Sequence, residues 1–266
     1  MSILKEILDH KSQEVKVQRA KVSEKSLEDR LYFKKPIVSM KVHLKSLDKI
    51  GIISEIKRSS PSEGSINSNI DVEHLSKGYI EAGASALSVL SDYKYFGGTL
   101  DDVLTARKFN DCPILRKEFI VDEYQLLEAR SVGADCILLI AAALSEKRCN
   151  ELADFAKSIG LEVLLEVHNK QEIDSHISAS VDVVGVNNRD LHNFTTSIQT
   201  SIELSEYIPN EFVKISESGI TSAEHIVELK KHGFEGFLIG THFMNHKQPN
   251  EACAKLIQEV KKLELQ

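Results

Sequence analysis

The sequence from residue 52 to residue 64 reads IISEIKRSSPSEG. It begins with mainly aliphatic residues, as in a buried β-strand, and continues into a loop of Ser, Pro and Gly. Because side chains alternate along a strand, Ile53, Glu55 and Lys57 project to the same side. An acid and a base on the inward side of an apolar strand are costly to bury unless a functional site uses them. The stretch therefore predicts a strand that carries functional groups at its carboxyl end.

The order of apolar run, polar turn and helix-like segment repeats along the chain. About eight such units follow one another at a mean spacing of roughly 27 residues, which is typical of parallel βα units. About eight units in roughly 215 residues predict an α/β fold, the closed (β/α)8 TIM barrel. The alternative is an open doubly wound sheet, but the Gly-x-Gly-x-x-Gly turn that this fold favours after its first strand is missing. The expected strands are 51–56, 84–90, 113–116, 135–141, 162–167, 182–187, 213–216 and 235–240.

The amino-terminal part of the chain precedes these units. An apolar stripe at helical spacing predicts a helix over residues 3–31, and residues 38–47 form a weaker candidate for a short helix. No low-complexity linker divides the chain. We therefore expect one barrel domain over residues 1–266, with residues 1–48 as an N-terminal helical extension. The expected barrel helices are 72–81, 100–109, 123–132, 146–158, 171–179, 197–206, 223–231 and 251–263.

Charge and composition exclude several classes of function. The net charge of −7 and the pI near 5.8 argue against a nucleic-acid or membrane-surface partner. No apolar run reaches the roughly 18 residues that span a bilayer. The four cysteines are far apart, and we interpret them as buried, reduced thiols of a cytoplasmic protein. No Cys/His cluster indicates zinc, so we expect neither a metal nor a cofactor. The oligomeric state stays open, and a monomer fits the sequence.

Polar residues at the ends of the expected strands are the candidates for catalysis, because barrel active sites lie at the carboxyl ends of the strands. A lone lysine there is usually a solvated surface residue. Two lysines beside three glutamates favour a functional cluster instead, since mixed charges shift pKa values and supply both an acid and a base. The candidates are Glu55, Lys57, Lys117, Glu166, Asn187, Glu217 and Ser218.

Small residues follow the seventh and eighth expected strands, as Ser218-Gly219 and Gly240-Thr241. Loops at these positions often hold a phosphate with backbone N–H groups. Glycine is expected where the backbone must approach an oxyanion or adopt a strained turn. Either pair alone could be a plain turn, but together they predict a phosphate site. The segment 58–70 is rich in Ser, Asn and Gly, which predicts a mobile lid over a small ligand.

Several short motifs, spread over nearly the whole chain, are informative when they are taken in combination. They are ILKEI (3–7), SEIKRSSPS (54–62), ALSVLSD (86–92), YFGG (95–98), PILRKEFI (113–120), GVNNRDL (185–191) and SESGI (216–220). In combination they resemble the indole-3-glycerol-phosphate synthase family of tryptophan biosynthesis, although no single motif would be specific.

The resemblance implies a (β/α)8 barrel with an extra N-terminal helical segment over the active-site end. It also implies a carbon–carbon lyase that needs no cofactor. The substrate, a small phosphosugar derivative, would be 1-(2-carboxyphenylamino)-1-deoxyribulose 5-phosphate. Ring closure with loss of carbon dioxide and water would give indole-3-glycerol phosphate.

The family's residue roles can be carried to matching positions. Lys117 would be the general acid and Glu166 the general base. Lys57 would pair with the substrate carboxylate, while Glu55 and Asn187 orient the intermediate. The other matches are Glu217 and Ser218 as further site residues, Ser60, Gly219 and Gly240 for the phosphate, Leu90 and Phe96 for the aromatic ring, and Arg189 for substrate binding. We add Thr241 to the phosphate site from its place after the eighth expected strand.

Two alternatives and one departure accompany this interpretation. Phosphoribosylanthranilate isomerase, another phosphosugar barrel, should show an Asp/Cys pair at the strand ends. A non-catalytic phosphate-binding barrel should have lost the acid–base set. The departure lies after Gly240, where many relatives have Ser or Glu and this chain has Thr241-His242. Thr keeps a hydroxyl and an N–H, so we keep the predicted phosphate site.

Overall fold

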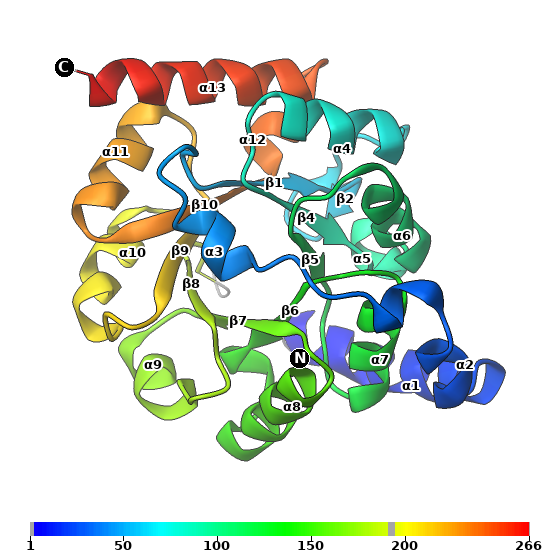
Figure 1. The fold of residues 1–266 in the computed structure, drawn as a ribbon. Helices are drawn as coiled ribbons and strands as arrows, with labels where there is room; N and C mark the ends of the chain where they lie inside the picture. Colours follow the sequence, from blue (N-terminus) through cyan, green and yellow to red (C-terminus); the bar gives the residue numbers. More distant parts are fainter. Residues whose placement is uncertain (1–2, 191–194, 266) are drawn as a thin grey trace.

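The computed structural model describes residues 3–190 and 195–265, in which eight parallel strands close into a barrel (Figure 1). Each strand pairs with the next along the chain, and the last pairs with the first, so the barrel is closed. The prediction of a (β/α)8 barrel is confirmed, and the open sheet is excluded. The strands are β1 (Ile52–Ile56), β4 (Ala86–Leu90), β5 (Ile114–Lys117), β6 (Cys136–Ile140), β7 (Glu162–Val167), β8 (Val183–Asn187), β9 (Val213–Glu217) and β10 (Phe234–Ile239).

Helices surround the barrel, and several of them begin where the sequence supplies capping side chains. The side chains of Asp71, Thr99, Ser145 and Ser222 each accept a hydrogen bond from the backbone N–H three residues later. Such caps satisfy N–H groups that have no partner within the helix. The helices are α4 (Val72–Glu81), α6 (Leu100–Phe109), α7 (Glu123–Ser131), α8 (Glu146–Ser158), α9 (Lys170–His176), α10 (Gln199–Leu204), α11 (Ala223–Lys231) and α13 (Pro249–Glu264), with short α5 (Tyr93–Phe96) and α12 (Thr241–Met244) and the 3-10 turns η2 (Ala141–Ala143) and η3 (Ser205–Tyr207).

The apolar core has two layers because side chains alternate along each strand. One layer lies between the strands and the outer helices and includes Ile52 and Leu87. The other fills the barrel interior and includes Ile53, Leu115 and Leu164. Since Ile53 points inward, the alternation also directs Glu55 inward, as the sequence predicts.

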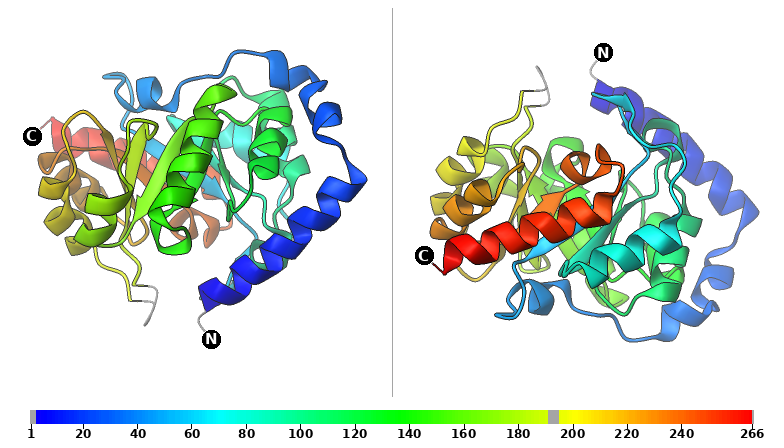
Figure 2. Two further views of the ribbon diagram at one scale, coloured as in Figure 1. Left: turned by 90° about the horizontal axis from the view of Figure 1, so that it is seen from below. Right: turned by 90° about the horizontal axis from the view of Figure 1, so that it is seen from above.

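The N-terminal segment reaches both ends of the barrel. The helix expected over 3–31 is interrupted: α1 (Ile3–Lys21) ends, and the side chain of Ser23 accepts from the N–H of Ser26 to start α2 (Glu24–Glu28). A 3-10 turn, η1 (Leu31–Lys34), leads to α3 (Met40–Leu44), whose two terminal residues belong to the interior core. Figure 2 shows α1 and α3 at opposite ends of the barrel.

The candidate lid contains a small hairpin that the sequence analysis did not anticipate. Strand β2 (Ser59–Ser60) pairs antiparallel with β3 (Gly64–Ser65). Leu191, at the end of one motif, lies outside the described residues, as do the ends of the expected domain. No helix within 3–190 or 195–265 combines the length and the apolar character that a membrane crossing requires.

Candidate active site

A cavity of about 540 Å³ opens at the carboxyl ends of the strands. The first turns of α1 and the β2–β3 hairpin lie over it, and they contribute Ile3, Ile7 and Pro61 to its wall. The structure brings every predicted site residue to this one cavity. They are Glu55, Lys57, Ser60, Leu90, Phe96, Lys117, Glu166, Asn187, Arg189, Glu217, Ser218, Gly219, Gly240 and Thr241.

Two lysines and three glutamates form ion pairs at the floor of the cavity. Lys117 Nζ, at the end of β5, lies 3.2 Å from Glu166 Oε2 and also contacts Glu217 Oε2. Lys57 Nζ lies 3.2 Å from Glu55 Oε1. The three carboxylates are buried. With every group ionised, this cluster would carry one more negative charge than positive.

Burial and the neighbouring charges together shift the pKa values of the cluster. Burial alone would lower the pKa of Lys117, but the carboxylates of Glu217 and Glu166 outweigh it and raise the pKa above its ordinary value. Burial favours the neutral form of Glu166, yet Lys117 and His168 together hold its pKa below the ordinary value. Burial also acts on Glu217, and with the neighbouring Glu166 it raises the pKa to about 7 against the attraction of Lys117. At neutral pH the lysine is therefore charged, Glu166 is ionised and Glu217 is partly protonated.

Glu166 has polar partners on both of its oxygens. Its Oε2 faces Lys117, and its Oε1 accepts a hydrogen bond of 3.1 Å from Asn187 Nδ2. His168 Nε2 lies 3.6 Å from the same Oε1. The backbone N–H of His168 donates to Glu172 Oε2 at 2.7 Å, which fixes the loop behind Glu166. The carboxylate is thus held in one orientation toward the cavity.

Space for Glu217 is provided by Gly185 in β8. A Cβ atom at Gly185 would overlap Oε1 of Glu217. That buried oxygen has no hydrogen-bond partner among the described residues, which agrees with the raised pKa of its carboxyl group. The sequence analysis gave Gly185 no role. A glycine inside an apolar strand can mark the close approach of another group, and this feature of the sequence could have indicated its role.

The glycines of the expected phosphate site are required for different reasons. Ser218 and Gly219 adopt consecutive left-handed conformations, with φ of 68° and 71°. For a serine this conformation is strained, as is common at functional sites. Gly240 has φ of −117°, so a strained turn is the wrong reason for a glycine there. A Cβ at Gly240 would instead overlap the carboxylate of Glu55.

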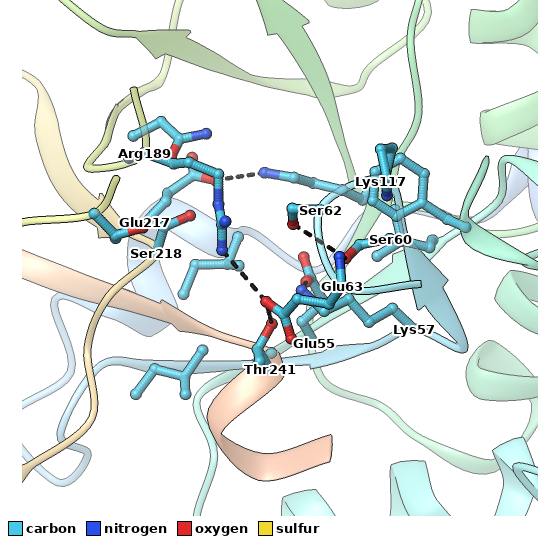
Figure 3. Close-up of a pocket in the computed structure, with 18 of the residues that line it drawn as sticks. Glu55, Lys57, Ser60, Ser62, Glu63, Lys117, Arg189, Glu217, Ser218 and Thr241 are labelled. Carbon is cyan, nitrogen blue, oxygen red and sulfur yellow. Dashed lines mark hydrogen bonds and ion pairs between the residues drawn. The ribbon is translucent and has the colours of Figure 1, made fainter. Parts of the chain in front are cut away.

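The tip of the hairpin contacts two of the predicted substrate-binding residues through Glu63. Glu63 Oε1 lies 3.4 Å from Arg189 Nη2 and accepts a hydrogen bond of 3.2 Å from Thr241 Oγ1 (Figure 3). The backbone N–H of Glu63 donates to Ser60 Oγ at 3.2 Å. Sequence reasoning missed Glu63, because nothing in its neighbourhood along the chain indicates partners in the segments that follow β8 and β10.

One wall of the cavity is apolar. Leu90 ends β4, and the Phe96 ring lies 6.1 Å from the Phe119 ring, centroid to centroid. The short helix α5 that carries Phe96 is capped by Asp92, whose Oδ1 accepts from the N–H of Tyr95 at 2.7 Å. Such a wall suits an aromatic ring, whereas the opposite side of the cavity is polar.

A buried lysine fastens α1 to this wall. Lys11 is 2% exposed, and its Nζ lies 2.9 Å from Asp92 Oδ2, 3.1 Å from Glu118 Oε1 and 2.7 Å from Glu14 Oε2. Glu118 directly follows the end of β5, and Asp92 lies two residues past the end of β4. The sequence analysis did not assign Lys11 a role, although a lysine on the apolar stripe of α1 was its visible signal.

Two histidines near the phosphate end have a spacing that zinc-binding helices use. His242 and His246 are four residues apart, and their ring centroids are 5.5 Å apart. No third ligand joins them, since residues 3–190 and 195–265 contain no group of three or more His, Cys, Asp or Glu side chains placed to hold a metal ion.

The fold and the cavity define a class of protein. A closed (β/α)8 barrel with titratable side chains converging at the carboxyl ends of its strands is the architecture of barrel enzymes.

Comparison with known proteins identifies the family within this class. A sequence model described as indole-3-glycerol phosphate synthase matches residues 4–256. The indole-3-glycerol phosphate synthase of Bacteroides thetaiotaomicron is 45% identical over 258 residues, covering 97% of this chain and 98% of the relative. That of Delftia acidovorans is 36% identical over 263 residues, covering 96% and 98%. The chain belongs to the indole-3-glycerol phosphate synthase family, which confirms the resemblance seen in the motifs.

Family membership establishes the activity class. The protein is a lyase of tryptophan biosynthesis that decarboxylates a small phosphorylated substrate while it closes a ring.

Solved structures show the same fold in more distant proteins. A mutant tryptophan synthase alpha-subunit from Pyrococcus furiosus aligns with a TM-score of 0.63 at 15% identity, covering 82% of this chain and 100% of that chain. At this identity the likeness concerns the barrel fold alone.

Proposed function

We propose that the cavity converts 1-(2-carboxyphenylamino)-1-deoxyribulose 5-phosphate to indole-3-glycerol phosphate, with Lys117 as general acid and Glu166 as general base. The observation that carries this assignment is the position of Lys117 Nζ between two buried carboxylates, 3.2 Å from Glu166 and in contact with Glu217. An ammonium that stays charged and a carboxylate that stays ionised at neutral pH are the two groups that acid–base catalysis needs.

The chemistry uses these groups in sequence. Attack of the aromatic carbon on the sugar carbonyl forms the new carbon–carbon bond, and the carbonyl oxygen takes a proton from Lys117. The carboxylate then leaves as carbon dioxide, and its bonding electrons neutralise the iminium on the ring. In the dehydration, Glu166 accepts a proton from the adjacent carbon, and the hydroxyl departs as water with a second proton from Lys117, which has taken up a proton from solvent after ring closure. Fixed charges around the reacting atoms stabilise each step.

The charges of the cavity suit a substrate with two anionic ends. Lys57, now paired with Glu55 at 3.2 Å, would turn to the substrate carboxylate. Protonation of Glu217 would relieve the repulsion that the incoming negative charge creates. Asn187 would hold Glu166 in place as the intermediate forms.

The two remaining parts of the substrate would occupy opposite sides. We place the phosphate at the backbone N–H groups of Gly219 and of Gly240-Thr241, where Ser60 and Arg189 also line the cavity. The strained pair Ser218-Gly219 supports this placement. The aromatic ring would pack between Leu90 and Phe96, next to the residues of α1. Glu55 would orient the intermediate together with Asn187, and Ser218 would be a further site residue.

The cellular setting follows from composition. We propose that residues 1–266 work as one domain in the cytoplasm, without a nucleic-acid or membrane partner. The net charge of −7 and four buried free cysteines support this setting.

One assay tests the reaction, and one variant tests the base. The purified protein mixed with the carboxyphenylamino-deoxyribulose phosphate should produce indole fluorescence, whereas phosphoribosylanthranilate should stay unconverted. Glu166→Gln keeps size and hydrogen bonding and loses basicity, so it should depress kcat much more than it raises KM. A change in KM alone would make Glu166 a binding residue. Turnover of phosphoribosylanthranilate instead would favour the isomerase alternative.

A further inference from the structure

We propose that Glu63 is an internal competitor for the substrate phosphate, and that it thereby sets the affinity and selectivity of the anion site. Its carboxylate occupies that site when no substrate is bound. The inference rests on the phosphate placement proposed above, and it adds a residue that the chemistry does not use.

The geometry at Glu63 is that of a bound anion. A single oxygen, Oε1, faces Arg189 Nη2 at 3.4 Å and accepts from Thr241 Oγ1 at 3.2 Å. These donors belong to different parts of the barrel, since Arg189 follows β8 and Thr241 follows β10. Both line the cavity and both were predicted from the sequence to bind substrate. Figure 3 shows Glu63 between them.

The same residue also engages the third predicted phosphate ligand. The backbone N–H of Glu63 donates to Ser60 Oγ at 3.2 Å, and Ser60 Oγ lies 3.3 Å from Ser62 Oγ. The Ser60 oxygen is therefore held within the hairpin as an acceptor, beside the Ser62 hydroxyl. One acidic residue thus engages Ser60, Arg189 and Thr241 at once.

The surroundings of the hairpin tip leave room for Glu63 to move away from Arg189 and Thr241. The Glu63 side chain is 29% exposed, and no heavy atom lies within 4 Å of a Cβ built at Gly64. The base of the loop is fixed independently, because the N–H of Ile66 donates to the carbonyl of Arg58 at 2.9 Å. The tip can therefore move while its base stays in place.

Displacement has a direct electrostatic consequence. A carboxylate and a phosphate dianion cannot share the same two donors, because like charges a few ångströms apart repel strongly where water is partly excluded. Only a ligand whose anion outcompetes the Glu63 carboxylate gains access to Arg189 and Thr241. The site thereby favours phosphorylated substrates over analogues with a weaker anion or none.

The test compares two Glu→Gln variants that lose the same charge. Glu63→Gln removes the competitor and keeps its shape. Glu73→Gln is the matched control, because Glu73 also faces a cation, Lys77 at 3.8 Å, but lies on α4 and outside the cavity lining. Calorimetric titration with inorganic phosphate should give a Kd about two- to fivefold lower for Glu63→Gln, the range expected for freeing a partly exposed ion pair. Glu73→Gln should match the wild type.

Several outcomes would overturn the inference. Equal phosphate affinity of Glu63→Gln and wild type would show that the carboxylate does not compete. Weaker binding by Glu63→Gln would mean that Glu63 supports the bound loop instead. An equal gain in phosphate affinity for Glu73→Gln would show that the effect comes from the change in net charge and not from the position of Glu63. The titration measures phosphate affinity without turnover, so its result does not depend on the proposed reaction. If the wild-type protein failed to turn over the proposed substrate, the proposed function would be wrong, whatever the titration shows.

Discussion

Lys117 is the residue on which the proposed chemistry depends most directly. Lys117→Ala should lower kcat by roughly a hundredfold to ten-thousandfold, the usual consequence of losing a general acid. The substitution also leaves the buried carboxylates of Glu166 and Glu217 without their shared cation, so the melting temperature should be measured beside kcat. Steady-state kinetics on the folded variant check the prediction. A variant that keeps more than half of the wild-type kcat would remove Lys117 from the mechanism.

Glu217 should make stability depend on pH near neutrality. Its pKa of about 7 in the folded protein exceeds the ordinary 4.5, because burial disfavours its charge. The folded state therefore binds the proton more tightly, and its stability falls as pH rises from about 4.5 to about 7. Glu217→Gln, which is neutral at every pH, avoids this loss.

Relative to the wild type, Glu217→Gln should therefore gain about 2–3 kcal/mol of unfolding free energy between pH 5 and pH 8. Urea unfolding of both proteins at the two pH values measures this difference. A difference that is the same at both pH values would show that Glu217 keeps an ordinary pKa in the folded protein.

Some site residues could be predicted from the sequence because a local pattern determines where they point. Others could not be predicted, because tertiary packing determines their position. Alternation along one strand was enough to place Glu55 and Lys57 on the inward side. Glu63 has its partners 126 and 178 positions away along the chain. Gly185 matters only because β8 lies beside Glu217. These relations depend on tertiary packing, which no local pattern contains.

At the scale of elements, the best-predicted helices are those with local start signals. The bounds of α4, α6, α8 and α11 match the expected ranges, and each begins after a capping Asp, Thr or Ser. The short α5, α12 and β2–β3 hairpin were missed because elements of two to four residues have little propensity of their own. The expected helix over 3–31 is divided because Ser23 begins a new helix.

The hairpin segment 58–70 should become more ordered when a ligand binds. Its tip is held by polar contacts of Glu63 and Ser60 rather than by apolar packing, and such segments open at low free energy. Hydrogen exchange of the amides in 58–70, measured with and without indole-3-glycerol phosphate, should show slower exchange with the product. The amides of β7 serve as the internal control. Equal exchange in both states would mean that the segment is not a lid.

At the scale of the whole molecule, the chain before β1 acts on both ends of the barrel. Met40 and Leu44 of α3 enter the interior core at the amino-terminal end, where the N–H of Met40 donates to Glu162 Oε2 at 2.7 Å. At the other end, α1 contributes Ile7 to the cavity wall. The sequence predicted a helical extension over 1–48, and the family resemblance placed it over the active site. Its contact with the opposite end was not predicted, because the five residues of α3 are too few for a sequence pattern that would indicate what they pack against.

The attachment of α1 should depend on one buried charge. Lys11 is 2% exposed and faces Asp92 and Glu118, which are themselves buried. Lys11→Met keeps a long flexible side chain and removes the charge, which leaves Asp92 buried without its cation and Glu118 with Arg116 as its remaining cation. Loss of one partner of a buried ion pair costs about 3–5 kcal/mol, far more than a surface substitution. Urea unfolding should show a loss of this size.

The matched control for this substitution is Lys16→Met, on the same helix but exposed to solvent. It should leave the unfolding free energy within about 0.5 kcal/mol of the wild type. Because Asp92 also caps the helix that carries Phe96, Lys11→Met should in addition raise KM for the aromatic substrate. Adding Glu118→Gln to Lys11→Met should recover part of the lost stability, since one of the two buried negative charges that Lys11 balances is then gone. If Lys11→Met were as stable as Lys16→Met, the ion pairs of Lys11 would contribute nothing to holding α1, and the apolar contacts of its inner face would have to account for the attachment alone.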